Sequence, residues 1–124
     1  MQCESARPLR ERSRLAQRVA FEIFGEPGAL EEQSAWYRAQ REGVVAALDV
    51  SGLTYVPIDG AFYVCVKLPH GGDSYAAALE LVERRGVVAI PGRIFGDCLE
   101  GWLRLSWVAP LDQFAEGLRR IASL

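Results

Sequence analysis

The stretch GWLRLSW, residues 101–107, places one arginine in a pattern that predicts a half-buried β-strand. Side chains alternate between the two faces of a strand, so Leu103, Leu105 and Trp107 share one apolar face. Arg104 lies on the opposite face, in the middle of the strand. A guanidinium stays charged at any working pH, and its burial is costly unless an anion meets it. The strand therefore raises the question of what Arg104 binds.

Three kinds of partner are open for this arginine. One is a carboxylate of the same chain, Glu100 or Asp97, and another is water. The third is a ligand, because a guanidinium held on a rigid strand can bind a carboxylate through two parallel hydrogen bonds. Taken alone, the strand pattern favours an internal carboxylate or simple exposure over a ligand.

The segments around this strand predict a layered fold. Short apolar runs bounded by turn residues predict strands, and periodic apolar positions predict helices. From about residue 52 onward the order is β-β-α-β-β-α. This order indicates an α/β fold of the α+β two-layer kind, with a small, mainly antiparallel sheet covered by helices. The expected strands are 53–56, 61–68, 87–90 and 101–107. One expected helix runs from Asp73 or Ser74 to Arg85, and a final amphipathic helix follows Pro110.

Two further helices are expected before the layered part, at 9–24 and 30–48, with a Gly- and Pro-containing break at 25–28. We assign residues 1–50 to an N-terminal helical segment and residues 51–124 to the layered domain. The apolar stripe of the first helix needs a surface to lie on, while the sheet already has two covering helices. The stripe therefore indicates a partner for this helix.

The composition excludes several classes of protein. The 124 residues, half of them hydrophobic, suffice for one globular domain, and the formal net charge of −2 gives no reason to expect nucleic acid or a membrane as partner. No apolar run approaches the roughly 18 residues of a membrane span, and the N-terminus lacks the apolar core of a secretory signal. Cys3, Cys65 and Cys98 are too far apart for a zinc motif, so we expect free thiols in a cytoplasmic protein.

Few residues could carry catalysis. His70, the only histidine, lies in a Gly-rich turn and is expected to be an exposed loop residue. Gly71 and Gly72, followed by a helix cap at Ser74, could hold a phosphate, but their spacing matches no phosphate-loop motif and favours a plain loop. Five arginines interleaved with acidic residues predict a solvated helix face: Arg7, Arg10, Arg12, Arg14 and Arg18.

The order of the motifs is more specific than any one of them. PIDGAFYV at 57–64 is followed by a helix, by RRGVVAIPGRIFG at 84–96 and by EGWLRLSWV at 100–108. This succession resembles the C-terminal, small domain of the class I and II, fold-type I aminotransferases, which depend on pyridoxal phosphate. The upstream LAQRVAFEIFGEP and YRAQREGVVAAL resemble the return helix and the long interdomain helix of the same family. The resemblance covers the chain from about Ser13 to its end.

This resemblance implies a role for the arginine of the opening stretch. By position, Arg104 corresponds to the arginine that binds the α-carboxylate of the amino acid or keto acid substrate. The resemblance also places one segment near the substrate entrance and one loop at the mouth of the site. The entrance residues are Gly60, Ala61, Phe62 and Tyr63, and the loop holds Phe95 and Gly96 together with Pro91 and Gly92, which are mainly structural.

The family also needs a lysine that forms a Schiff base, an aspartate on the pyridine nitrogen and a phosphate-binding cup, all in its large domain. Lys67 is the only lysine, and it lies outside the family's lysine motif. The chain is therefore expected to correspond to the last third of an aminotransferase. Alone, it is expected to hold no pyridoxal phosphate and to be inactive, whereas the full-length enzyme uses this cofactor.

A second interpretation is a stand-alone binding or interaction module. Such a module would associate with a large-domain partner or with itself, as a dimer or a domain swap, through Val19, Ile23 and Phe24 of the first helix. A piece without independent function is the third interpretation. Sequence alone does not choose the substrate side chain.

Overall fold

The computed structural model describes residues 13–28 and 30–124. Contacts divide the chain into two compact units, Met1–Ala35 and Trp36–Leu124, and each is described by itself. The first unit holds α1, Arg14–Gly25, none of whose residues is buried. The expected start of this helix at residue 9 lies outside the described residues.

The helix α2, Glu31–Ser51, begins in the first unit and continues into the second. Its residues Val44 and Leu48 are fully buried in the core of the second unit. The compact unit thus begins inside this helix, and the domain division at residue 50 drawn from the sequence stays a prediction. The helix ends at Ser51, and the next residue, Gly52, has a φ of +69°, which suits glycine. The Ser51 hydroxyl donates a hydrogen bond to the Leu48 carbonyl oxygen over 2.6 Å.

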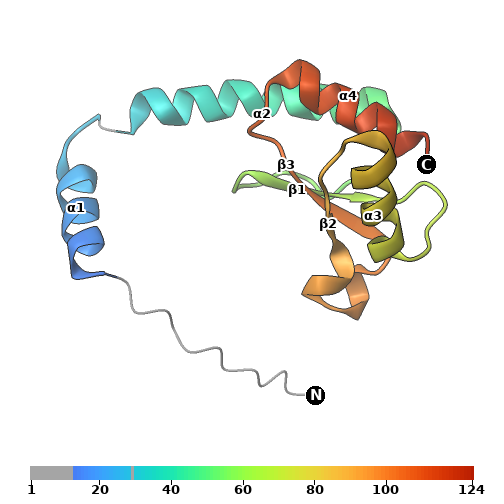
Figure 1. Ribbon diagram of the computed structural model, residues 1–124. Helices are drawn as coiled ribbons and strands as arrows, with labels where there is room; N and C mark the ends of the chain where they lie inside the picture. The colour runs from blue at the N-terminus through green and yellow to red at the C-terminus, as the bar shows by residue number, and fades with distance from the viewer. Residues whose placement is uncertain (1–12, 29) are drawn as a thin grey trace. The chain divides into compact units, whose positions relative to one another are not determined.

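A three-stranded antiparallel sheet forms the second layer of this unit. It consists of β1 (Tyr63–Lys67), β2 (Ile90–Pro91) and β3 (Trp102–Ser106), in the order β1-β3-β2. Both neighbours pair antiparallel with the central strand β3. Figure 1 shows this sheet with α3 (Ser74–Arg85) and α4 (Leu111–Ala122) beside it. The predicted two-layer α/β fold is confirmed.

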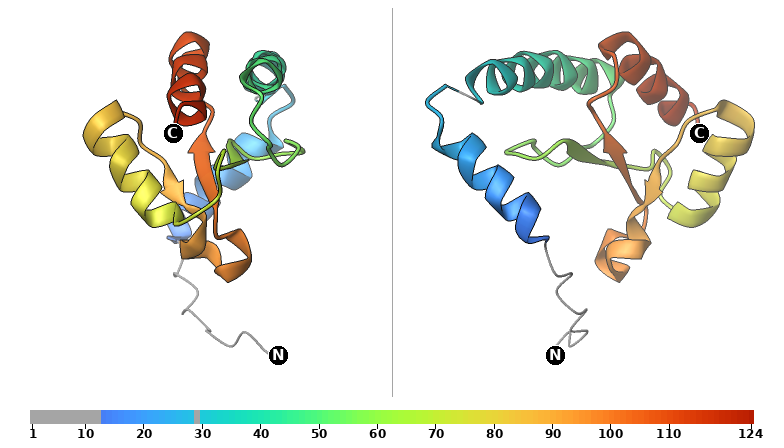
Figure 2. Two further views of the ribbon diagram at one scale, coloured as in Figure 1. Left: turned by 90° about the vertical axis from the view of Figure 1, so that its right-hand side faces the viewer. Right: turned by 60° about the vertical axis from the view of Figure 1, so that its left-hand side comes forward.

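All helices of the second unit cover the same face of the sheet. Figure 2 shows α3, α4 and the second part of α2 side by side above it. Apolar side chains from this face and from the three helices form one core. Burying them removes apolar surface from water, which is the main stabilising contribution to such a layer. The residues at most 1% exposed in this core are Val44, Leu48, Val66, Leu81, Leu103, Leu118 and Ile121.

The ends of α3 follow the sequence signals. The Asp73 carboxylate accepts hydrogen bonds from the backbone N–H groups of Tyr75 (2.8 Å) and Ala76 (3.2 Å), which caps the helix. Gly86 ends it in the left-handed conformation, with φ of +62°. The predicted start and end of this helix are confirmed.

The short strands differ from the prediction. Of the expected strand at 53–56, only Tyr55 pairs, as a single bridge to Val66. Of the expected strand at 87–90, only Ile90 pairs, because the chain reaches the edge of the sheet at this residue.

The loop before β3 contains two 3-10 turns, η1 (Gly92–Phe95) and η2 (Asp97–Leu99). A Cβ at Gly92 would collide with the Leu99 carbonyl oxygen and lie 2.8 Å from that of Trp102. Only glycine fits there, which lets the loop close tightly onto the sheet.

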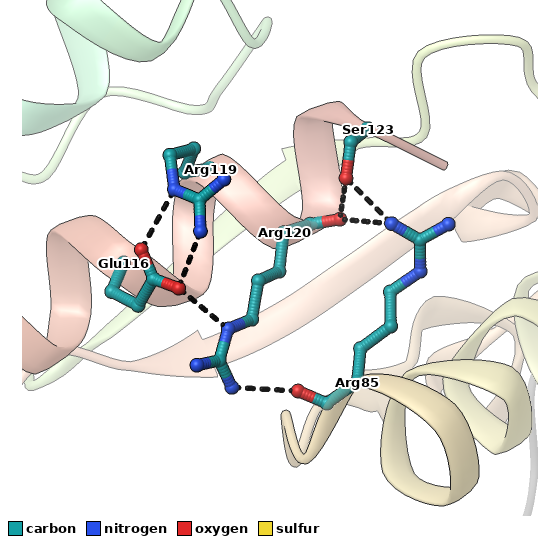
Figure 3. Close-up of polar contacts among 5 residues, drawn as sticks. All are labelled: Arg85, Glu116, Arg119, Arg120 and Ser123. Atoms are coloured by element: carbon teal, nitrogen blue, oxygen red, sulfur yellow. Dashed lines mark hydrogen bonds and ion pairs between the residues drawn. The ribbon is translucent and has the colours of Figure 1, made fainter.

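Polar contacts join the last turns of α3 and α4 (Figure 3). Arg85 donates to the Arg120 carbonyl oxygen and to the Ser123 hydroxyl, and Arg120 donates back to the Arg85 carbonyl oxygen over 2.7 Å. The Glu116 carboxylate accepts from Arg119 (2.6 and 2.7 Å) and from Arg120 (2.8 Å). These bonds to Arg119 and Arg120 lower the pKa of Glu116 from 4.5 to about 2.

The lowered pKa of Glu116 predicts a defined acid dependence of stability. A carboxyl group whose pKa is lower in the folded state stabilises the fold above its unfolded pKa of 4.5, and this contribution is lost as the pH falls toward about 2. Thermal unfolding of the chain and of Glu116→Gln should therefore differ most above about pH 5 and converge as the pH falls through this window. Glu83→Gln controls for the loss of one exposed charge. A difference that stays constant down to pH 2 would contradict this assignment.

Candidate functional site

Arg104 lies at the centre of the sheet, on the face that the helices leave free. In the register of β3, Arg104 is opposite Cys65 on β1 and Ile90 on β2. Residues opposite one another in an antiparallel pair share a face, so these three side chains lie together. The neighbouring positions Leu103 and Leu105 point into the core on the other face. The alternation predicted from the sequence is confirmed.

Two aromatic rings flank the guanidinium. Its central carbon lies 4.1 Å from the ring centroid of Tyr63 and 4.4 Å from that of Phe95. A cation over the face of an aromatic ring is stabilised by about 0.5–2 kcal/mol, more as water is excluded. The rings hold the arginine's plane without using its N–H groups, which remain available to an acceptor.

The N–H groups of this arginine have no protein acceptor in the described part of the chain. Arg104 is half-buried, its Nε atom is buried without a hydrogen-bond partner, and no carboxylate within residues 13–28 and 30–124 forms an ion pair with it. A buried donor left without an acceptor costs about 1–3 kcal/mol. Such an unpaired donor is unusual in an otherwise well-packed sheet.

The internal partners considered from the sequence do not meet Arg104. Glu100 instead accepts from the backbone N–H groups of Ser74 (2.7 Å) and Gly101 (3.1 Å), and its other oxygen lies 3.6 Å from Arg93. The bonds from Ser74 hold the pKa of Glu100 below its ordinary value. The other alternative, Asp97, begins η2 and forms no ion pair with Arg104. An internal salt bridge is therefore wrong as the explanation of this arginine.

Cys65 is the side chain directly across from the arginine. It is half-buried and a free thiol, as expected from the sequence. Burial raises the pKa of the Cys65 thiol, and the nearby positive charge of Arg104 opposes this effect. Its position in the register could have been found from the sequence by pairing the two predicted strands, but no motif singled it out.

The predicted entrance residues fall into two places. Tyr63 and Phe95 contact the guanidinium, whereas residues 60–62 line a separate hollow of about 400 Å³ next to α2. The rings of Phe62 and Tyr63 lie against each other, with centroids 4.2 Å apart. Gly96 joins the two 3-10 turns with φ of +137°, a conformation that requires glycine. The structure thus brings Tyr63 and Phe95 to Arg104, and their proposed roles at an entrance stay predictions.

The remaining sequence candidates do not form a second site of this kind. At the start of α3, Asp73 and Glu100 already accept the backbone N–H groups that a phosphate would need. This overturns the phosphate alternative, because two carboxylates repel an anion there. His70 is an exposed loop residue, as expected. Among the expected cluster of arginines, Arg14 and Arg18 are exposed, and Arg7, Arg10 and Arg12 lie outside the described residues.

Two kinds of feature are absent from the described residues. No helix there combines the length and the apolar character that crossing a membrane requires. In the same ranges, His, Cys, Asp and Glu residues nowhere gather in threes that could hold a metal ion.

Comparison with known proteins identifies the class. The family model "Aminotransferase class I and II" matches residues 4–121, and the chain therefore belongs to this family. It is 39% identical over 89 residues to LL-diaminopimelate aminotransferase of Nitratidesulfovibrio vulgaris. This match covers 71% of this chain and 23% of that protein. It is 30% identical over 101 residues to LL-diaminopimelate aminotransferase of Dehalococcoides mccartyi. This match covers 82% of this chain and 26% of that protein. The chain thus spans about a quarter of the length of these relatives.

Solved structures agree with this assignment. The fold is similar to that of an aminotransferase from Staphylococcus aureus, with a TM-score of 0.74 at 28% identity, over 89% of this chain and 30% of the other. It is also similar to L,L-diaminopimelate aminotransferase from Chlamydomonas reinhardtii, with a TM-score of 0.69 at 25% identity, over 90% and 28%. The described fold is that of a partial aminotransferase domain.

Pyridoxal phosphate is the cofactor that this family implies for the full-length enzyme. It needs an amine, a carboxylate for its pyridine nitrogen and donors for its phosphate in one place. Lys67, the only lysine, is exposed at the end of β1. The hollow beside it, lined by residues 51–54 and 68–71, contains no carboxylate. Residues 13–28 and 30–124 therefore do not fit the cofactor.

The position of Cys65 gives a prediction about the charge of Arg104. Arg104→Gln should raise the pKa of the Cys65 thiol further, because it removes the one charge that lowers it. Alkylation rates at Cys65 measured against pH by peptide mass spectrometry check this, with the exposed Cys98 as internal standard. Arg104→Lys keeps the charge and should leave the pKa nearer to that of the unaltered chain. An unchanged or lower pKa of the Cys65 thiol in Arg104→Gln would show that the guanidinium does not lie close to this thiol.

Proposed function

We propose that this chain is the carboxylate-binding small domain of an aminotransferase, in which Arg104 holds the α-carboxylate of an amino acid or keto acid. The observation that carries the proposal is the state of Arg104. It is a half-buried guanidinium on the open face of the sheet, flanked by two rings, without a carboxylate partner in the described chain.

The geometry suits a carboxylate. A guanidinium presents a planar pair of N–H groups that match the two oxygens of a carboxylate. The rings of Tyr63 and Phe95 contact the guanidinium without accepting hydrogen bonds from it, so its N–H groups are left for a carboxylate. The strand holds the residue from both sides by backbone pairing, which keeps the site preorganised.

The proposal assigns binding, and not the chemical step, to this chain. The chain spans about a quarter of the length of its curated relatives, and its residues do not fit the cofactor. The amine and the cofactor site are therefore proposed to come from a large domain. The names of the relatives make LL-diaminopimelate, a dicarboxylic diamino acid, a candidate substrate of the complete enzyme.

Titration of the labelled chain with 2-oxoglutarate tests the binding role. The guanidinium N–H resonances of Arg104 should move on titration, and Arg104→Lys should weaken binding by about tenfold because it loses the second parallel hydrogen bond. Arg104→Gln should abolish it. Arg84→Gln removes an exposed arginine from α3 and should leave the affinity unchanged.

Binding that survives in Arg104→Gln would contradict the proposal. Transamination of an amino acid with 2-oxoglutarate by the pure chain, with pyridoxal phosphate added, would contradict the proposal that a large domain supplies the amine and the cofactor site.

One observation favours a second candidate, an interaction module. The helix α1 has no buried residue, and its apolar side chains Leu15, Phe21 and Phe24 are more than 70% exposed. Exposed apolar patches of this kind mark contact surfaces. A large-domain partner, or a second copy of the chain, would cover these side chains.

Light scattering at several protein concentrations tests self-association through α1. The chain should show a mass that rises with concentration, and a Phe21→Ser and Phe24→Ser double variant should stay monomeric, because it removes the most exposed apolar area. Val88→Ser, at an equally exposed apolar position in the second unit, is the matched control and should behave like the unaltered chain. A monomeric mass for the unaltered chain throughout would exclude the self-associating module.

A further inference from the structure

A second hollow lies on the opposite face of the sheet from Arg104. It has a volume of about 400 Å³, within the range of roughly 300–1,000 Å³ typical of small-molecule sites. Its apolar walls are the rings of Tyr37, Phe62 and Trp107, and residues 60–61 form one rim. Trp107 shares the helix-covered face with the core leucines of β3, so the hollow is separate from the arginine site.

The walls of this hollow are fixed by three contacts. The Trp107 backbone N–H donates to the Phe62 carbonyl oxygen over 3.0 Å. The Gln40 side chain on α2 donates to the Ala109 carbonyl oxygen over 2.8 Å, which ties the chain after β3 to that helix. The rings of Tyr37 and Trp107 meet edge to face, with centroids 5.9 Å apart. The hollow is therefore built by the fold rather than left open between mobile side chains.

Two positive charges stand at this hollow. Arg38 and Arg41 both line it, and they are three residues apart on α2, which places them on neighbouring parts of one helix face. Both are exposed, and neither forms an ion pair with a residue in the described ranges. A pair of free guanidinium groups beside an apolar hollow attracts an anionic group carried on an apolar body.

Two further features single out this place in the fold. The indole Nε1 of Trp107 is buried and has no hydrogen-bond acceptor among the described residues, although the side chain is only 2% exposed. Buried donors are normally paired, so an unpaired one in a residue that lines a hollow is unusual. On the rim, Ala61 has φ of +57°, the one described residue other than glycine with positive φ. Backbone strain of this kind collects at ligand sites.

We propose that this hollow binds a small aromatic carboxylate, with its ring against Tyr37 and Phe62, next to the buried Trp107, and its carboxylate on Arg38 and Arg41. The ligand class follows from the walls: flat rings stack on flat rings, and the paired guanidinium groups select the anion. The site does not depend on the role of Arg104, since the two lie on opposite faces of the sheet.

Titration of the ¹⁵N-labelled chain with 2-naphthoate tests the proposal. The indole N–H signal of Trp107 should shift and saturate, while that of Trp102, on the face that carries Arg104, should stay in place. Replacing both arginines, Arg38→Gln with Arg41→Gln, should weaken binding by about tenfold or more, because it removes both charge-assisted contacts. The neutral 2-naphthamide should bind the unaltered chain about tenfold or more less tightly than 2-naphthoate does, because it lacks the negative charge.

A matched variant separates this site from others. Arg84→Gln removes an exposed arginine from α3 and should leave the Trp107 titration with 2-naphthoate unchanged. Equal affinity for acid and amide at Trp107, or an undiminished Trp107 titration in the double variant, would each overturn the proposal, as would the absence of any shift at Trp107. Circular dichroism confirms that the variants, all at solvent-accessible positions, are folded.

Discussion

Antiparallel pairing of β3 with strands on both sides is the constraint on which the rest of the second unit depends. It fixes the alternation of the strand, so that Leu103 and Leu105 enter the core and Arg104 cannot. A slip of one residue would bury a guanidinium among leucines and expose the core, which is strongly unfavourable. The register of β3 therefore also determines on which face the charge of Arg104 lies.

The same constraint separates stability from function. The three helices pack on one face, and their apolar side chains form the core together with those of that face of the sheet and of the adjoining loops. The other face is left to side chains that stabilise the fold little: Arg104 and Cys65 at its centre, with Tyr63 and Phe95 around the guanidinium. A face that is not needed for the core can carry a charged group toward a ligand. In the second unit, this division explains how an arginine with no protein acceptor persists in a central strand.

Much of this could be predicted from the sequence, and the failures have physical causes. Alternation identified β3 and its arginine, and the Asp73 cap with Gly86 fixed α3, because those signals are local. The strands expected at 53–56 and 87–90 are apolar but almost unpaired, since pairing depends on a neighbour that sequence does not show. Glu100 was a plausible partner for Arg104 by proximity in the chain, but the backbone N–H groups of Ser74 and Gly101 bind it instead. The hollow at Trp107 joins residues about 70 positions apart, beyond any local pattern.

The structure of the chain bound to 2-oxoglutarate is the most direct test of the central claim. We expect one carboxylate of the keto acid to lie in the plane of the Arg104 guanidinium, with two parallel N–H···O bonds of about 2.7–2.9 Å. Tyr63 and Phe95 should keep their places on either side of that plane. A keto acid bound elsewhere, with Arg104 turned to a carboxylate of its own chain, would contradict the account.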